Sequence, residues 1–305
     1  MRNIALVVVC VGWVFPFERA FGQPEAFSAL VYTRTAGFRH DSIPAGVAMV
    51  RELGERRCFT VEHTEDPASF TAANLARFRV VVFLNTTGDV LDSAQEAAME
   101  GFVRNGGGFV GIHSAADTEY EWPFYRELIG AYFLSHPAEA SADLHVEDAG
   151  HPATAHLPSP WSRFDEWYNF RRNPRPDVRV LLRIDESTYS GGTMGADHPI
   201  AWCDTIDAGR TFYTAGGHTV ETYSEPLFRR HVLGGVLWAA GFEEISECMG
   251  DLDCDGGVGL ADLAVLLAHV GATGAGYRDG DLDGNGEVNL ADLSLLLAAF
   301  GVECL

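Results

Sequence analysis

The chain has 305 residues, of which 47% are hydrophobic, and a formal net charge of −22 at pH 7. This acidic balance argues against nucleic acids and anionic membranes as partners, because both repel negative charge. Eleven Asp and Glu residues face a single Arg between residues 245 and 305, so the C-terminal fifth differs in composition from the rest.

The N-terminus has the layout of a secretory signal peptide. Arg2 precedes an apolar run over residues 4–17, and small residues follow at Ala20 and Gly22. Fourteen apolar residues are too few to span a bilayer, and no later segment does better. We therefore predict a signal peptide over residues 1–22, no membrane span, and a secreted or cell-surface protein.

Residues 25–242 alternate β-branched runs with helical stretches, which predicts one domain of the α/β class. The apolar run at residues 80–84 is typical of a central parallel strand, which is buried on both faces. A capping box of Ser93 and Glu96 predicts a helix that ends at Asn105. The pattern indicates a parallel sheet with helices on both faces. The other expected elements are strands at 29–33, 59–63 and 109–112, and helices at 44–54 and 72–78.

Polar side chains follow or flank the predicted strands. Ligands of such sheets bind beyond the carboxyl ends of the strands, so these residues are candidates for a site. They are His40, His113, Asp117, His136, Glu166, Trp167, Tyr168 and His218.

These polar stretches also carry a family resemblance. GFRHDSI, NTTGDVL, GGGFVGIHSAADT, HPAT, DEWYNF, GRTFYTAGGH and VLWAAG resemble the ThuA-like (trehalose utilisation) family over residues 28–241. The resemblance implies the flavodoxin-like sheet of the class I glutamine amidotransferases and a role related to sugars. Those relatives carry a cysteine nucleophile on the turn after the glycine-rich strand. Here that turn has His113 and Ser114, which excludes glutaminase chemistry, and the serine lacks the nucleophile-elbow pattern.

Imidazole at that turn suits proton transfer near neutral pH or metal ligation. We expect His113, His218, Glu166 and His40 to be catalytic, against the simpler interpretation of structural histidines at tight turns. A zinc-like divalent ion held by the same residues is a second possibility. Substrate binding is assigned to His136, Trp167, Tyr168 and Asp117, although aromatic residues at strand spacing also occur in cores.

Three functions fit these residues. The first is an enzyme (a hydrolase, lyase or isomerase) acting on a sugar or keto-sugar by acid–base chemistry. The second is a module that binds carbohydrate in the same cleft without turnover. The third is an assembly component in which the C-terminal region matters most.

That C-terminal region contains a duplicated calcium-loop motif. GDLDCDGGVGLADLAVLLAHVG, from residue 250, and GDLDGNGEVNLADLSLLLAAFG, from residue 280, share fourteen of 22 positions. Oxygen ligands recur at loop positions 1, 3, 5 and 12, glycine stands at position 6, and position 7 offers its carbonyl, as in an EF-hand. The predicted calcium ligands are Asp251, Asp253, Asp255, Gly257 and Asp262, then Asp281, Asp283, Asn285, Glu287 and Asp292.

Each loop leads into one apolar helix, at residues 260–269 and 290–300, with no helix before the first loop. This arrangement resembles a type I dockerin, which implies docking onto a cohesin-type partner or the cell surface. Gly259 replaces the Asn found at Asn289, which weakens the first loop. We assign residues 243–249 to a short linker and 250–305 to a small all-α calcium-binding domain, which either docks or caps the large domain.

The cysteines suggest one crosslink. A disulfide between Cys248 and Cys304 would join the two ends of the repeat pair. Cys254 has no obvious partner, and Cys58 and Cys203 are expected to be buried thiols.

Overall fold

A computed structural model describes residues 27–243 and 249–304. The predicted signal peptide, Cys248 and most of the predicted linker lie outside these residues. Over the part of the chain described, no helix is both long enough and apolar enough to cross a membrane.

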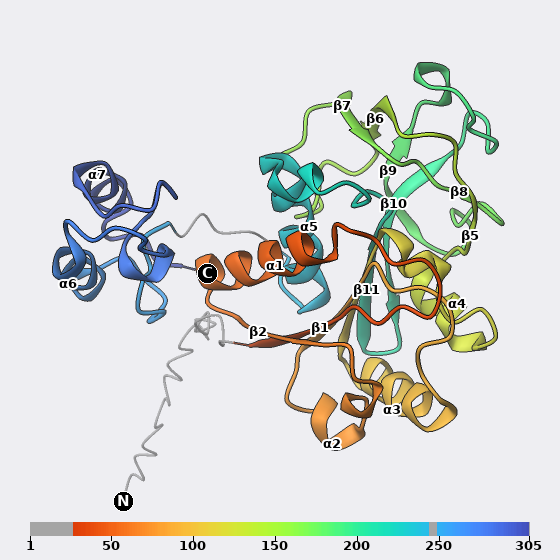
Figure 1. The fold of residues 1–305 in the computed structure, drawn as a ribbon, viewed down its shortest axis with the longest axis horizontal. Helices are drawn as coiled ribbons and strands as arrows, with labels where there is room; N and C mark the ends of the chain where they lie inside the picture. Colours follow the sequence, from red (N-terminus) through yellow and green to blue (C-terminus); the bar gives the residue numbers. More distant parts are fainter. Residues whose placement is uncertain (1–26, 244–248, 305) are drawn as a thin grey trace, which may run out of the picture.

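The large domain is built on a nine-stranded mixed sheet with the order β2-β1-β3-β4-β11-β10-β9-β6-β7 (Figure 1). The first five strands run parallel and form the flavodoxin-like part that the sequence predicts. All five residues of both β3 and β4 are buried, because helices cover both faces of this part. The parallel strands are β1 (Ser28–Tyr32), β2 (Thr60–Thr64), β3 (Val80–Leu84), β4 (Gly108–Ile112) and β11 (Gly209–Thr214).

The other half of the sheet is antiparallel and was not predicted. β10 pairs with β11, and β9, β6 and β7 continue outward with antiparallel pairings. This extension matters for function because β7 ends next to Glu166. The strands are β6 (Ala140–Val146), β7 (Trp161–Asp165), β9 (Arg179–Ile184) and β10 (Pro199–Ile206), with a separate pair of β5 (Phe133–Ser135) and β8 (Asn169–Phe170).

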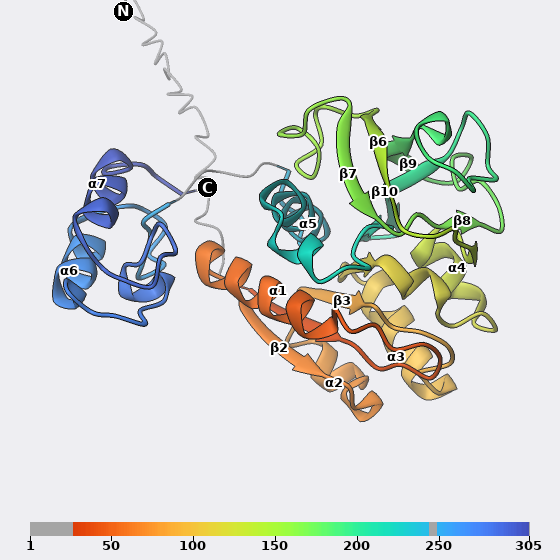
Figure 2. The ribbon, with the colours of Figure 1, turned by 45° about the horizontal axis from the view of Figure 1, so that its top comes forward.

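Helices cover the parallel strands on both sides (Figures 1 and 2). α1 (Ile43–Arg57) and α5 (Pro226–Ala239) lie together on one side, and α2 (Ala72–Leu75), α3 (Ser93–Arg104) and α4 (Pro123–Ile129) lie on the other. α5 approaches the sheet closely because Gly235 has no side chain. A Cβ there would lie 2.3 Å from the Phe212 ring.

The cap of α3 differs from the prediction by one residue. Asp92, and not Ser93, is the N-cap: its carboxylate accepts hydrogen bonds from the backbone N–H groups of Ala94 and Gln95, and the Gln95 side chain accepts from the Asp92 N–H. Asp92/Gln95 and Ser93/Glu96 both satisfy the capping-box spacing, and Asp is at least as good a cap as Ser.

The C-terminal unit has a small core of its own. α6 (Leu260–His269) and α7 (Leu290–Ala298) follow the two loops, as predicted, and a 3₁₀ turn, η5 (Tyr277–Asp279), lies between them. Six of the eight buried residues of this core form pairs thirty positions apart, so the two copies contribute alike to it. These pairs are Leu252 and Leu282, Val258 and Val288, and Leu266 and Leu296.

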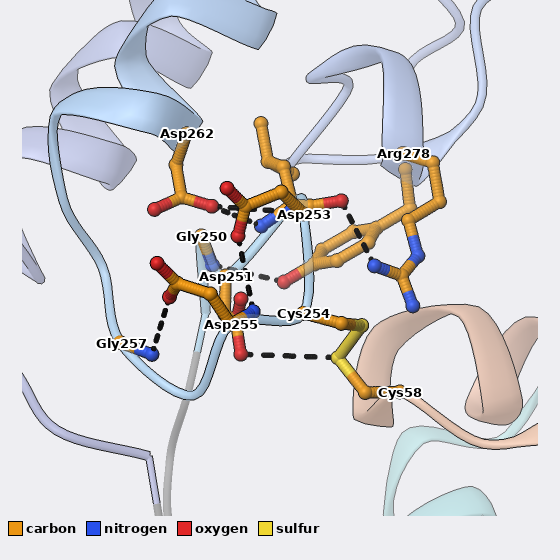
Figure 3. The surroundings of a disulfide bond; sticks show 11 residues. Cys58, Gly250, Asp251, Asp253, Cys254, Asp255, Gly257, Asp262 and Arg278 are labelled. Carbon is orange, nitrogen blue, oxygen red and sulfur yellow. Dashed lines mark hydrogen bonds between the residues drawn. A yellow bond between two sulfur atoms is a disulfide. The ribbon is translucent and has the colours of Figure 1, made fainter. Parts of the chain in front are cut away.

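A disulfide that the sequence did not indicate fastens this unit to the large domain. Cys58, which follows the last residue of α1, is bonded to Cys254 of the first loop, with 5.7 Å between their Cα atoms (Figure 3). Cys58 is therefore not a free thiol, whereas Cys203 is one and is buried, as expected. Cys304 is also disulfide-bonded. Its predicted partner, Cys248, lies outside the described residues, so that pairing stays a prediction.

Noncovalent contacts surround the disulfide. The Arg56 guanidinium lies over the Tyr277 ring, 5.0 Å from its centroid, and the Tyr277 hydroxyl accepts a hydrogen bond from the Gly250 N–H. Arg278 donates to the Leu252 carbonyl across the base of the first loop. The C-terminal unit is thus seated on the C-terminal end of α1.

Candidate functional site

Four strand ends bring the predicted catalytic residues together. His40 lies in the loop after β1, His113 directly follows β4, His218 lies in the loop after β11, and Glu166 directly follows β7. Three of these side chains are buried, and His218 is half-buried. One ligand atom of each lies within 4.8 Å of the ligand atoms of the other three. The cluster therefore spans both halves of the sheet, at the end where ligands of such folds bind.

His113 forms the floor of this cluster. Its φ of +51° is in the left-handed region that residues with a Cβ avoid, so the chain turns sharply out of β4 at a backbone cost of about 1–3 kcal/mol. The ring is completely buried, and its Nδ1 lies 2.7 Å from the Ala215 carbonyl oxygen. A carbonyl can only accept, so Nδ1 carries the proton and a neutral His113 presents the lone pair of Nε2 to the cluster.

Glu166 and His218 meet His113 at this point. Glu166 Oε2 lies 3.5 Å from His113 Nε2 and 3.2 Å from His218 Nδ1, and these two nitrogens are 3.3 Å apart. On its outer side, His218 Nε2 lies 3.2 Å from Glu139 Oε1. His40 Nδ1 lies 3.3 Å from the Ser114 hydroxyl.

A buried carboxylate holds the His218 loop in place. Asp165, the last residue of β7, accepts hydrogen bonds from the backbone N–H groups of Gly217 and His218 and from the Thr222 hydroxyl. The negative charge of Asp165 is balanced by Arg163, which is also buried and whose Nη2 lies 3.0 Å from Asp165 Oδ2. Asp165 is thus the support of the loop that carries His218.

The predicted substrate-binding residues divide into two groups. His136 is half exposed, and its Nδ1 lies 2.8 Å from Glu166 Oε1, so it is part of the cluster. Tyr168 packs on His113 with 4.3 Å between ring centroids. Trp167, in contrast, is completely buried and donates to the Ala140 carbonyl, so its ring faces are covered by protein. Asp117 accepts a hydrogen bond from Tyr120 at the end of the turn that follows β4.

The charges of the cluster follow from these contacts. Burial alone would raise the pKa of Glu166, but its interactions with the His113 and His218 imidazoles outweigh burial and bring the pKa down to about 2. The hydrogen bond to Glu166 raises the pKa of His218 against the effect of burial. Burial, reinforced by the neighbouring histidines, lowers the pKa of His40 to about 3.

Glu139 is a residue that sequence reasoning missed. It lies in the loop between β5 and β6, and no motif or spacing marks it. Only the antiparallel half of the sheet brings that loop next to His218.

Each C-terminal loop brings three carboxylates together. Side-chain oxygens of Asp251, Asp253 and Asp255 lie within 4.8 Å of one another, and so do those of Asp281, Asp283 and Asp292. Asp251 Oδ1 is buried and has no hydrogen-bond partner within the described residues. Asp262 and Asp292 play the same part in both copies: each accepts from two N–H groups at the start of its loop and from the residue before its helix.

The remaining predicted ligands belong to the same loops. Asn285 accepts from the Glu287 N–H and donates to Asp283. Gly257 and Glu287, whose carbonyls the motif uses, each form one isolated bridge, to Glu303 and Thr273.

A cavity of about 660 Å³ lies at the opposite, amino end of the parallel strands, between α2 and α3. Its lining includes Arg77 and Arg79 but no histidine or carboxylate. It therefore lacks paired acid–base groups, and the histidine cluster is the better candidate for chemistry.

The fold and the cluster define a flavodoxin-like α/β protein with its polar site at the carboxyl ends of the strands. Residues 28–239 match the family described as "ThuA: Trehalose utilisation", and the chain belongs to that family.

Solved structures agree with this fold. A thua-like protein from Bacteroides uniformis is 24% identical with a TM-score of 0.60, over 70% of this chain and 92% of its own. A thua-like protein from Parabacteroides merdae is 20% identical with a TM-score of 0.62, over 74% of this chain and 94% of its own. No protein with a curated functional description matches the chain.

Proposed function

We propose that this protein is a secreted, carbohydrate-related ThuA-like enzyme that acts on a sugar or keto-sugar through its histidine–carboxylate cluster. The observation that carries this proposal is the convergence of His40, His113, His218 and Glu166 on one point at the ligand-binding end of the sheet. His136 and His218 lie on its open side, so a substrate can reach the cluster from solvent.

The arrangement suits proton transfer beside a sugar carbonyl or hydroxyl. It brings a carboxylate and imidazole nitrogens within 3.5 Å of one another, which are the groups that general acid–base catalysis uses. Elimination, isomerisation and hydrolysis all begin with such transfers. Cysteine chemistry is disfavoured, because Cys203 is buried in β10 and burial raises its pKa to about 12.

Turnover of a sugar panel that includes trehalose and oxidised sugars tests this proposal. His113→Ala should abolish turnover, while His145→Ala, on the exposed side of β6, should leave it unchanged. Binding of a sugar with no product from any substrate would favour the alternative, a carbohydrate-binding module. Full activity of His113→Ala would refute the catalytic assignment.

For the C-terminal unit we propose calcium binding and attachment to a cohesin-like protein or cell-surface scaffold. The buried, unpartnered oxygen of Asp251 supports a cation in the first loop. Leu260 and Leu290, equivalent in the two copies, are both 76% exposed, which supports a protein partner for the helices. The Cys58–Cys254 disulfide supports an oxidising, extracellular compartment.

Capture of the full chain by an immobilised cohesin in millimolar calcium tests this attachment. A chelator, or Leu260→Asp combined with Leu290→Asp, should abolish capture. Equal capture with and without calcium would contradict the proposal, and so would no capture at all.

A further inference from the structure

We propose that the cluster is a binding site for one zinc-like divalent ion, held by His113, His218 and Glu166 with His40 as the fourth ligand. The inference rests on the proposed function, since it specifies how the same site would act. Four observations carry it.

The first observation is the spacing of the ligand atoms. In a tetrahedral zinc site with bonds of about 2.0–2.1 Å, neighbouring ligand atoms are about 3.3–3.4 Å apart. The three distances among His113 Nε2, His218 Nδ1 and Glu166 Oε2 are 3.2, 3.3 and 3.5 Å. A tetrahedral ion therefore fits between these atoms with little movement of the side chains.

The second observation is the support of each ring on its far side. Metal-binding histidines typically donate their other N–H to a carbonyl or carboxylate, which fixes the ring and the tautomer. His113 Nδ1 faces the Ala215 carbonyl and His218 Nε2 faces Glu139, so each ring directs its other nitrogen into the cluster. His40 follows the same pattern more loosely, with Nδ1 against the Ser114 hydroxyl.

The third observation is that the ligand atoms that face the centre of the cluster are all electron-rich, so a cation between them would stabilise the arrangement. When Nδ1 of His113 and Nε2 of His218 carry the protons, the lone pairs of both rings and the Glu166 carboxylate face one another. A divalent cation between these atoms would replace this repulsion with attraction. The other Glu166 oxygen is held by His136 at 2.8 Å, as expected for a ligating carboxylate.

The fourth observation concerns the type of metal. Imidazole nitrogens with one carboxylate suit zinc and its first-row neighbours, whereas calcium and magnesium take oxygen ligands. His136 lies on the half-exposed side of the cluster, from which a sugar oxygen would approach the ion as a fifth ligand, as catalytic zinc sites allow. His113 and His218 would hold such an ion, which would supply polarisation of that oxygen.

Metal content of the full-length chain tests the site. The chain should bind one equivalent of zinc from zinc chloride, and calcium should not displace it. Cobalt(II) bound in its place should give the intense visible absorption of a tetrahedral site. His218→Ala and the isosteric Glu166→Gln should lose both signals, and His145→Ala should keep them. Glu139→Gln should weaken zinc binding by about 10–100-fold. Tryptophan fluorescence establishes that each variant is folded.

Two results would separate this inference from the proposed function. A chain stripped of metal that keeps full sugar turnover would overturn the metal site and leave the proposed function standing. A chain that binds zinc as described but turns over no sugar would overturn the function and leave the site standing. Zinc binding of equal strength in the unmodified chain and in His218→Ala would also overturn the inference.

Discussion

Replacing both Cys58 and Cys254 by glycine tests how strongly the crosslink stabilises the large domain. Both residues have left-handed backbones, with φ of 58° and 63°, where glycine is the favoured residue. The second loop has glycine at the equivalent place, Gly284, with φ of 79°. The double variant therefore removes the disulfide without straining either turn.

The expected loss follows from the length of the closed loop. The bonded cysteines are 196 positions apart, and the loop contains most of the large domain. For a loop of that length the chain-entropy relation gives about 5 kcal/mol at 25 °C. Glycine relieves the left-handed backbone strain at each of the two positions, which restores about 1 kcal/mol of stability per position. We therefore expect the free energy of unfolding to fall by about 3 kcal/mol.

Urea unfolding followed by tryptophan fluorescence measures this loss, with calcium held at a fixed concentration. Five of the six tryptophans lie in the large domain, the sixth (Trp13) lies in the predicted signal peptide, and residues 249–304 contain none, so the unfolding signal reports the large domain. Cys203→Ser, which removes a free thiol, is the control for cysteine replacement itself. A double variant whose unfolding free energy lies within about 1 kcal/mol of the parent would refute the reasoning.

Three further predictions concern single residues. Burial raises the pKa of Glu119 from 4.5 to about 7, so stability should fall by about 3 kcal/mol as pH rises through that range. In Glu119→Gln the amide oxygen can still accept from the Val90 and Leu91 N–H groups, but the side chain no longer titrates. The free energy of unfolding, measured by urea titration at several pH values, should therefore depend less on pH in this variant. An unchanged pH dependence would contradict the prediction. Asp165→Asn should cost about 3 kcal/mol and lower sugar turnover by loosening the His218 loop, whereas unchanged stability and turnover would show that the loop needs no such support. Gly259→Asn should supply the cap that Asn289 gives to α7, adding a few tenths of a kcal/mol and tightening calcium binding by calorimetry; weaker binding would count against it.

Four of the five parallel strands follow from the sequence, and the signal is clearest in β3, whose five residues are all apolar. Residues 80–84 match β3 to the residue, and the expected strands before and after it are within one residue of β1, β2 and β4. The antiparallel half has no such signal. β7, for example, alternates buried and exposed residues over only five positions, and its place at the sheet edge depends on long-range pairing.

The same distinction applies to the candidate site. His40, His113 and His218 follow parallel strands, whose carboxyl ends meet at one edge, so their convergence could be expected. Glu166 and Glu139 reach that edge through the antiparallel strands, and only the structure places them. The pairing of Cys58 with Cys254 has no local signal either, because neither turn reveals its partner.

The Cys58–Cys254 bond also determines how mechanical load travels through the protein. If the C-terminal unit is held by a partner, a pull on it passes through a covalent bond into the end of α1. α1 packs beside the sheet that carries the histidine cluster, so an anchored protein would resist shear as one body and hold its site at a fixed orientation to the anchoring surface.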